Sequence, residues 1–136
     1  MAEKIPFRWS LCRQTVTLYH PDHDAGTVQR TLLRGVFFDS RRRETMDSDG
    51  AEGSGSFLLV IPAGVGEFSL FPGDRVVEGV GPVLDYAGWA DFSPANTPGV
   101  AAVQYVDRKT LRGIVTHTEA GGWWTSGGTG AHSLTN

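Results

Sequence analysis

Glycine and proline recur so often along this chain that they limit the elements it can form. The 136 residues include 18 glycines and 7 prolines. Both residue types interrupt helices and favour turns, so few segments are long enough for a full helix. The runs between them are short and rich in β-branched and aromatic residues, which favour strands. We therefore predict an all-β fold, a small β-barrel or sandwich, with any helix limited to a single turn near residues 84–89.

Local alternation and apolar runs place the predicted strands. Residues 15–19 read Thr-Val-Thr-Leu-Tyr and alternate polar with apolar side chains, as a half-buried strand does. Residues 28–38 form a longer strand in which Gly35 is a bulge or bend, and residues 57–61 are a continuous apolar run. Further strands are expected at residues 67–70, 75–78, 100–106 and 114–119, with a type II turn at 71–74 and a polar loop at 107–113.

Length and composition indicate one globular domain that spans residues 1–136, with its core at about residues 14–122. Hydrophobic residues are 40% and charged residues 20% of the chain, which is typical of globular proteins. The N-terminal sequence MAEKIPFRW lacks the apolar stretch of a signal peptide, and no run reaches the roughly 20 apolar residues of a membrane helix. We therefore expect synthesis in the cytoplasm and no membrane partner. The single cysteine excludes an internal disulfide.

Two polar stretches are expected to lie outside the β core. Residues 40–56 read SRRRETMDSDGAEGSGS, a composition that buries little apolar surface, so a long mobile loop is predicted. Residues 123–136 are rich in glycine, serine and threonine and are predicted to form a flexible C-terminal tail. This tail begins with Trp123 and Trp124. Adjacent residues in a strand face opposite sides, so one tryptophan can join the core while the other stays exposed.

Arginine and tryptophan side chains supply the candidate interface. Three consecutive arginines follow a strand that already carries Arg30 and Arg34, and such a cluster can bind phosphates or an acidic protein face. The alternative is a solvated loop whose charge is neutralised by the acidic residues downstream. An exposed tryptophan can anchor a neighbouring subunit. The predicted partner or oligomer interface consists of Arg41, Arg42, Arg43, Trp123 and Trp124.

Residue patterns for catalysis or metal binding are weak. None of the four histidines lies in a catalytic motif. The segment 20–24, His-Pro-Asp-His-Asp, is rich in metal-binding side chains, but it also has the composition of a surface turn. The segment 47–50 resembles the start of a calcium loop without the glycine and glutamate that should follow. We expect no catalytic residue, no metal and no cofactor, so the chain is not expected to be an enzyme.

Four segments in a fixed order carry a resemblance to a known family. They are residues 15–38 with the polar stretch that follows, the strand that ends at Ile61-Pro62, the segment 68–79 (FSLFPGDRVVEG), and residues 103–122 with His117 and a closing glycine pair. In order and spacing they resemble the head-closure proteins of long-tailed bacteriophages, also called stopper, minor capsid or head-to-tail connector proteins. The sequence departs from that family in a longer 107–113 loop, in Thr118 where tryptophan is frequent, and in the extra residues beyond Gly122.

The resemblance implies a structural subunit of the virion neck. Roughly six or twelve copies would form a ring below the portal and its adaptor protein and above the tail protein. The ring would close the DNA channel after packaging and open for ejection, with transient contact to packaged DNA. The predicted loop would then line the channel through Asp47, Asp49, Gly50 and Glu52.

Two alternatives stay open. One is a tail-completion or tail-tube ring subunit of the same class of virus. The other is a small nucleic-acid-binding β-barrel, which would need aromatic and basic residues interleaved on one sheet face.

Overall fold

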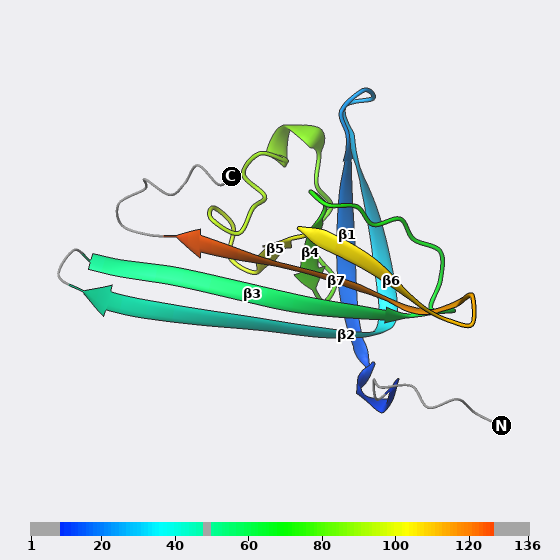
Figure 1. Ribbon diagram of the computed structural model, residues 1–136. Coiled ribbons are helices and arrows are strands. Elements are labelled where there is room, and N and C mark those ends of the chain that lie inside the picture. The colour runs from blue at the N-terminus through cyan, green and yellow to red at the C-terminus, as the bar shows by residue number, and fades with distance from the viewer. Residues whose placement is uncertain (1–8, 48–49, 127–136) are drawn as a thin grey trace.

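The predicted all-β fold is confirmed. A computed structural model describes residues 9–47 and 50–126, with side chains described for residues 10–42 and 53–124. Within this part of the chain the elements are η1 (Trp9–Leu11), β1 (Gln14–Asp22), β2 (Thr27–Asp47), β3 (Gly50–Pro62), β4 (Arg75–Glu78), η2 (Tyr86–Gly88), β5 (Val100–Ala102), β6 (Tyr105–Leu111) and β7 (Ile114–Ser126) (Figure 1). Neither helical turn of the described chain has the length or apolar character that crossing a bilayer requires.

Strand β2 belongs to both halves of a single antiparallel sheet. The strand order is β5-β4-β1-β2-β3-β7-β6. The first part of β2, up to Val36, pairs with β1, and the part from Phe37 onward pairs with β3. Gly35 has a φ of 83° and no partner in the register, which passes from Arg34 directly to Val36. The predicted bulge is thus confirmed, and β2 changes direction across the sheet near this residue (Figure 1).

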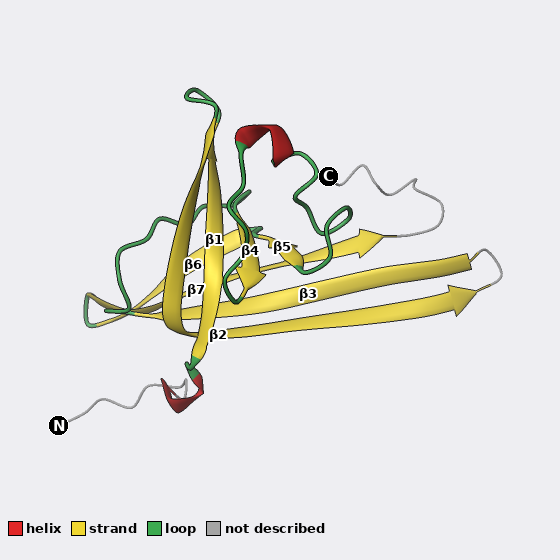
Figure 2. Cartoon of the chain, turned by 180° about the vertical axis from the view of Figure 1, so that it is seen from behind, coloured by secondary structure: helices red, strands yellow, loops and turns green. Residues whose placement is uncertain are grey.

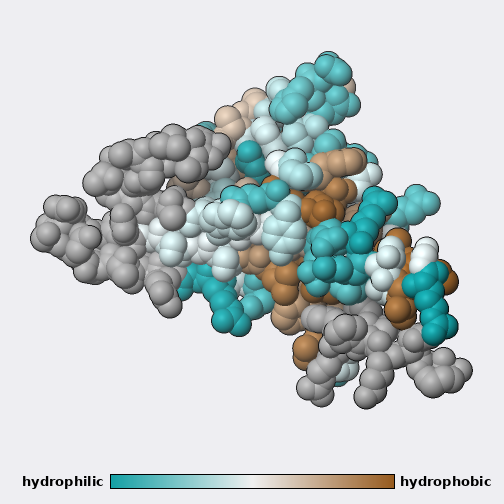
Figure 3. All heavy atoms as spheres, in the orientation of Figure 1, coloured by the Kyte–Doolittle hydropathy of each residue, from teal (hydrophilic) through white to brown (hydrophobic). Residues whose placement is uncertain are grey.

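Both halves of the sheet contribute to one hydrophobic core. Its buried members from the β1 half are Val16, Leu18, Leu33, Val36, Val76 and Ala101, and those from the β3 half are Phe38, Phe57, Leu59, Ile61 and Ala120. The sheet does not close into a barrel. Instead, β5 and β6 are the two edge strands of the sheet. Only Val103 and Gln104 connect them, so the chain brings the two edges of the sheet close together (Figure 2). Hydrophobic side chains gather in this body, while the β1–β2 turn above it is hydrophilic (Figure 3).

The segment 79–99 packs over β1 and is held there by side chains of the sheet. Tyr19 is fully buried against Phe92, and its hydroxyl donates to the carbonyl of Pro82 at 2.6 Å. Arg30 donates to the carbonyl of Gly81 through Nε at 3.1 Å and Nη2 at 2.5 Å. The single helical turn expected near residues 84–89 is present as η2.

The segment 71–74 forms the predicted turn. Asp74 N donates to Phe71 O at 3.0 Å, and Gly73 has a φ of 100°, as the third position of a type II turn requires. Asp74 is buried, and its Oδ1 lies 2.7 Å from His20 Nδ1. Burial raises the pKa of the Asp74 carboxyl, although hydrogen bonds from His20 and from Phe71 N–H lower it in part.

Four expectations about the limits of strands and loops were wrong. Residues 40–47 and 50–56 form a hairpin of β2 and β3, not a mobile loop, and residues 107–111 belong to β6, which turns into β7 at Arg112-Gly113. Residues 123–126 belong to β7, and residues 127–136 lie outside the described part. Residues 67–70 form no strand, although Leu70 joins the core. Pairing with a neighbouring strand completes the backbone hydrogen bonds of a polar segment even where apolar side chains do not alternate. The pattern of apolar residues therefore could not predict these strands.

Candidate interface site

The structure brings four of the five predicted interface residues together. Arg41 lies opposite Ser56, which lies opposite Trp123. Arg42 lies in the same way opposite Gly55 and Trp124. An open hollow of about 470 Å³ is lined by Arg41, Arg42, Ser54, Gly55, Ser56, Trp123 and Trp124, which we call the tryptophan–arginine hollow.

Trp124 is the inner tryptophan of this hollow. It is half-buried and packs against the hydrophobic core. Its indole lies directly over Gly55, because a Cβ at that position would be 2.6 Å from ring atoms Cε2 and Cη2. Gly55 is therefore part of the site. Sequence reasoning missed it, because Gly55 stands in a Gly-Ser-Gly-Ser run that is typical of flexible linkers.

Trp123 is the outer tryptophan, and 63% of it is exposed. Its backbone is fixed by the side chain of Gln104, which accepts from Trp123 N at 3.0 Å and donates to Trp123 O at 2.6 Å. Tyr105, 41% exposed, lies across Gly121, where a Cβ would be 2.7 Å from the tyrosine ring. Two exposed aromatic residues are thus held at fixed positions, as anchors of an interface need to be.

Arg41 gives the outer side of the site its positive charge. Its side chain is 81% exposed, and its Nε donates to Asp39 Oδ2 at 2.9 Å. Exposed ion pairs of this kind contribute only about 0–1 kcal/mol to stability. Arg41 is therefore not required for the fold and is accessible to a partner.

The larger basic cluster seen in the sequence is split by the fold. Arg30 holds the carbonyl of Gly81, and Arg34 lies opposite Thr15 in the other half of the sheet. Arg43 lies in β2 opposite Ser54, and its side chain is outside the described ones.

Three of the four expected channel residues have a described backbone, and they lie near the end of the β2–β3 hairpin. Asp47 is the last residue of β2 and pairs with Gly50, the first residue of β3. Glu52 is part of β3, and Asp49 lies outside the described residues. The side chains of these residues are also outside the described ones.

The histidine-rich segment 20–24 directs its side chains to separate partners. His20 contacts Asp74, and His23 Nδ1 lies 2.6 Å from the Tyr86 hydroxyl. Asp22 accepts the backbone N–H groups of Asp24 and Ala25, which closes the turn. In the described part of the chain, no group of three or more His, Cys, Asp or Glu residues is arranged to hold a metal ion.

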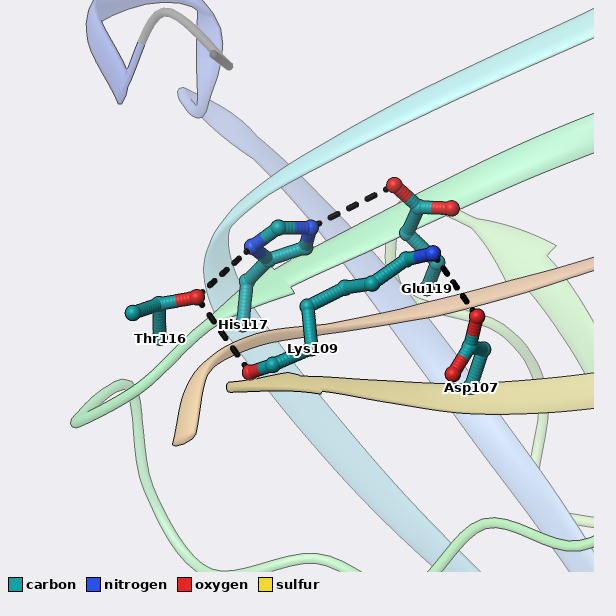
Figure 4. Close-up of polar contacts among 5 residues, drawn as sticks. All are labelled: Asp107, Lys109, Thr116, His117 and Glu119. Atoms are coloured by element: carbon teal, nitrogen blue, oxygen red, sulfur yellow. Dashed lines mark hydrogen bonds and ion pairs between the residues drawn. The ribbon is translucent and has the colours of Figure 1, made fainter. Parts of the chain in front are cut away.

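A second polar cluster lies where β6 meets β7 (Figure 4). His117 is buried, with Nε2 at 3.3 Å from Glu119 Oε2 and Nδ1 at 3.3 Å from the Thr116 hydroxyl. Beside it, Lys109 and Asp107 form an exposed ion pair at 2.8 Å, which raises the pKa of Lys109. One contact of this cluster joins the two strands, since the Thr116 hydroxyl donates to Lys109 O at 3.2 Å.

A search of curated proteins found no match, and a search of solved structures also found none. One family model matches residues 11–123, which run from the end of η1 to Trp123 and include Arg41, Arg42 and Gly55. The chain belongs to this family, DUF6751, a family of unknown function.

Proposed function

We propose that the chain is a non-enzymatic structural subunit that forms a ring in the neck of a long-tailed bacteriophage. The ring would lie between the portal with its adaptor protein and the tail, as a stopper that closes the DNA channel after packaging. The order and spacing of the four sequence segments described above, including FSLFPGDRVVEG at 68–79, support this proposal.

The β2–β3 hairpin is the observation that carries the proposal. It extends from a body whose two sheet halves share a hydrophobic core, and its outer end projects beyond that body (Figure 1). A stopper subunit needs such a division, since a rigid part must hold the ring while a projecting part reaches the channel. The tryptophan–arginine hollow lies between this hairpin and β7 and offers a contact surface for a neighbour.

Labelling of virus particles tests the proposed location. Gold-labelled antibodies against the chain should mark the junction between head and tail in electron micrographs. Label along the whole tail would favour the tail-tube alternative, and label only at the upper end of detached tails would favour a tail-completion subunit. Particles that carry no label would overturn the proposal.

A nucleic-acid-binding role is the second candidate. Tyr105, Trp123 and Arg41 lie on one face of the sheet, as that role requires, but Asp39 and Asp107 share this face and repel phosphates. A fluorescent thymidine oligonucleotide titrated at two salt concentrations separates the two roles. Tight binding that weakens steeply with salt would favour the nucleic-acid role.

A further inference from the structure

We propose that β6 of one copy adds as an antiparallel strand to the open edge of β2 in the next copy. This inference rests on the proposed ring and names the two strands that join its subunits. It follows from the direction of the backbone groups at both strands and from the charges along them.

The outer half of β2 has an open edge. Strand β1 pairs with β2 only as far as Val36, and beyond this point β2 pairs with β3 alone. At Phe38 the side chain of Gln14 takes the place of a strand, since it accepts from Phe38 N and donates to Phe38 O, both at 2.9 Å. Alternate residues of a strand direct their backbone groups to the same side. Ser40 and Arg42 therefore point to the open edge, where no backbone partner meets them within the described residues.

The second edge is β6, the last strand of the sheet order. The hydroxyl of Thr116, a β7 residue, donates to Lys109 O at 3.2 Å, so the backbone of Lys109 faces β7. By the same alternation, Val106 and Arg108 direct their N–H and C=O groups away from β7. No backbone hydrogen bond of the described residues meets these outward groups, so strand β6 also has an open edge there.

One register joins the two edges with opposite charges. With Ser40 opposite Arg108, Asp39 lies opposite Lys109 and Arg41 lies opposite Asp107. These four side chains share one face of the sheet, since their strand positions are connected through β3 and β7. Each is at least 40% exposed and is paired within its own strand, Arg41 with Asp39 and Lys109 with Asp107. The contact would therefore exchange or share existing ion pairs without burying an unpaired charge.

Neighbouring registers are disfavoured by like charges. A shift of two residues in one direction places Asp39 opposite Asp107. The same shift in the other direction places Arg41 opposite Lys109. Like charges directly opposite each other destabilise a pair of strands, so the alternation selects a single register.

A second copy is the occupant that this pattern fits. Both edges and both charge patterns belong to the same chain, and they lie at opposite ends of the strand series β2-β3-β7-β6. Contact between two different surfaces repeats from copy to copy, and it closes into a ring when the rotation between copies permits. Pairing of β2 with β2 would instead be symmetric and would stop at two copies.

Cysteine cross-linking between separately labelled copies tests this contact. Chains carrying Arg41→Cys and chains carrying Asp107→Cys, both with Cys12→Ser, are mixed and oxidised with diamide. In the proposed register their Cα atoms form a non-hydrogen-bonded pair about 4.5 Å apart, within reach of a disulfide. We expect a covalent pair that contains one chain of each kind.

The matched control replaces Arg41→Cys by Asp39→Cys, which is two residues, or about 7 Å, out of register. Its yield with Asp107→Cys should be at least about tenfold lower. Equal yields, or efficient cross-linking of Arg41→Cys chains to each other, would overturn the proposed contact. The single substitutions Arg41→Asp and Asp107→Arg should each prevent assembly. A chain that carries both substitutions should assemble again.

Electron microscopy of the same samples separates the two proposals. Rings without the cross-link would overturn the strand contact and leave the proposed function standing. Cross-linked open filaments without rings would support the contact and count against the ring. Neither rings nor cross-links would overturn both.

Discussion

Replacement of Gly55 by alanine tests whether close packing of Trp124 fixes the tryptophan–arginine hollow. The new Cβ would lie 2.6 Å from two atoms of the indole, a separation that real side chains do not tolerate. The ring must therefore move away from Gly55 and lose part of its packing against the core. Forcing extra atoms into a packed site costs about 1–3 kcal/mol.

The same substitution should have the opposite sign when the indole is absent. In a Trp124→Ala chain the Cβ at position 55 meets no ring, and alanine in a strand is more stable than glycine by about 0.5–1 kcal/mol. The coupling energy between the two positions is the difference of these effects, about 1.5–4 kcal/mol in total. A value of this size is expected only for residues in direct contact.

Urea denaturation followed by circular dichroism measures the four free energies of unfolding, and it does not depend on the fluorescence of the tryptophan that is removed. Ser56→Ala is the control, because this residue is exposed on the neighbouring position of β3 and should change the free energy by less than about 0.5 kcal/mol. An equal effect of Gly55→Ala in both backgrounds would show that Trp124 does not lie on Gly55.

Three further outcomes are expected. Arg30→Ala should cost about 1.5–3 kcal/mol and speed hydrogen exchange in residues 79–99, because it removes the charged donor to Gly81 O; unchanged exchange would contradict this role. Burial raises the pKa of Asp74 above its unfolded value, so the stability that its protonated carboxyl contributes is present at low pH and is lost as pH rises above about 4. Urea titrations of the parent and of Asp74→Asn, both with His20→Asn, should show a difference in the free energy of unfolding that changes with pH in this way. A difference that is constant with pH would refute the expectation. Replacing Arg41, Arg42 and Arg43 together by alanine should leave the melting temperature within a few degrees, since Arg41 and Arg42 are exposed and exposed charges add little stability. The same variant should prevent ring assembly in electron micrographs, and complete rings would remove the arginines from the interface.

The predictable part of the fold is the part where apolar side chains meet the core. The runs at residues 15–19, 28–38 and 57–61 became the inner parts of β1, β2 and β3, because their side chains are buried on at least one face. Gly35 and the Pro72-Gly73 turn were predictable for a different reason. Gly35 and Gly73 both have a positive φ, a backbone conformation that few residues other than glycine adopt.

The unpredicted part is the outer half of the β2–β3 hairpin. Its residues are polar and many are glycine or serine, so neither alternation nor an apolar run marks them as strands. The hairpin forms because each segment completes the hydrogen bonds of the other, and β7 extends alongside β3 as far as Gly53. The role of Gly55 became visible only in this register, because its contact with Trp124 joins residues that are distant in sequence.

The polar side chains of the outer β2–β3 hairpin, which gave no strand pattern in the sequence, also suit the proposed pairing of its open edge with a single partner. An open strand edge attracts any other strand, and charged side chains along it are a common protection against uncontrolled pairing. On β2 these charges alternate in sign between Asp39 and Arg41, and on β6 they alternate between Asp107 and Lys109. Charges of a single sign along an edge would repel or attract another strand equally in every register. Charges that alternate in sign favour one register over its neighbours. A free subunit with such edges can stay unpaired among unrelated strands and still assemble with copies of itself.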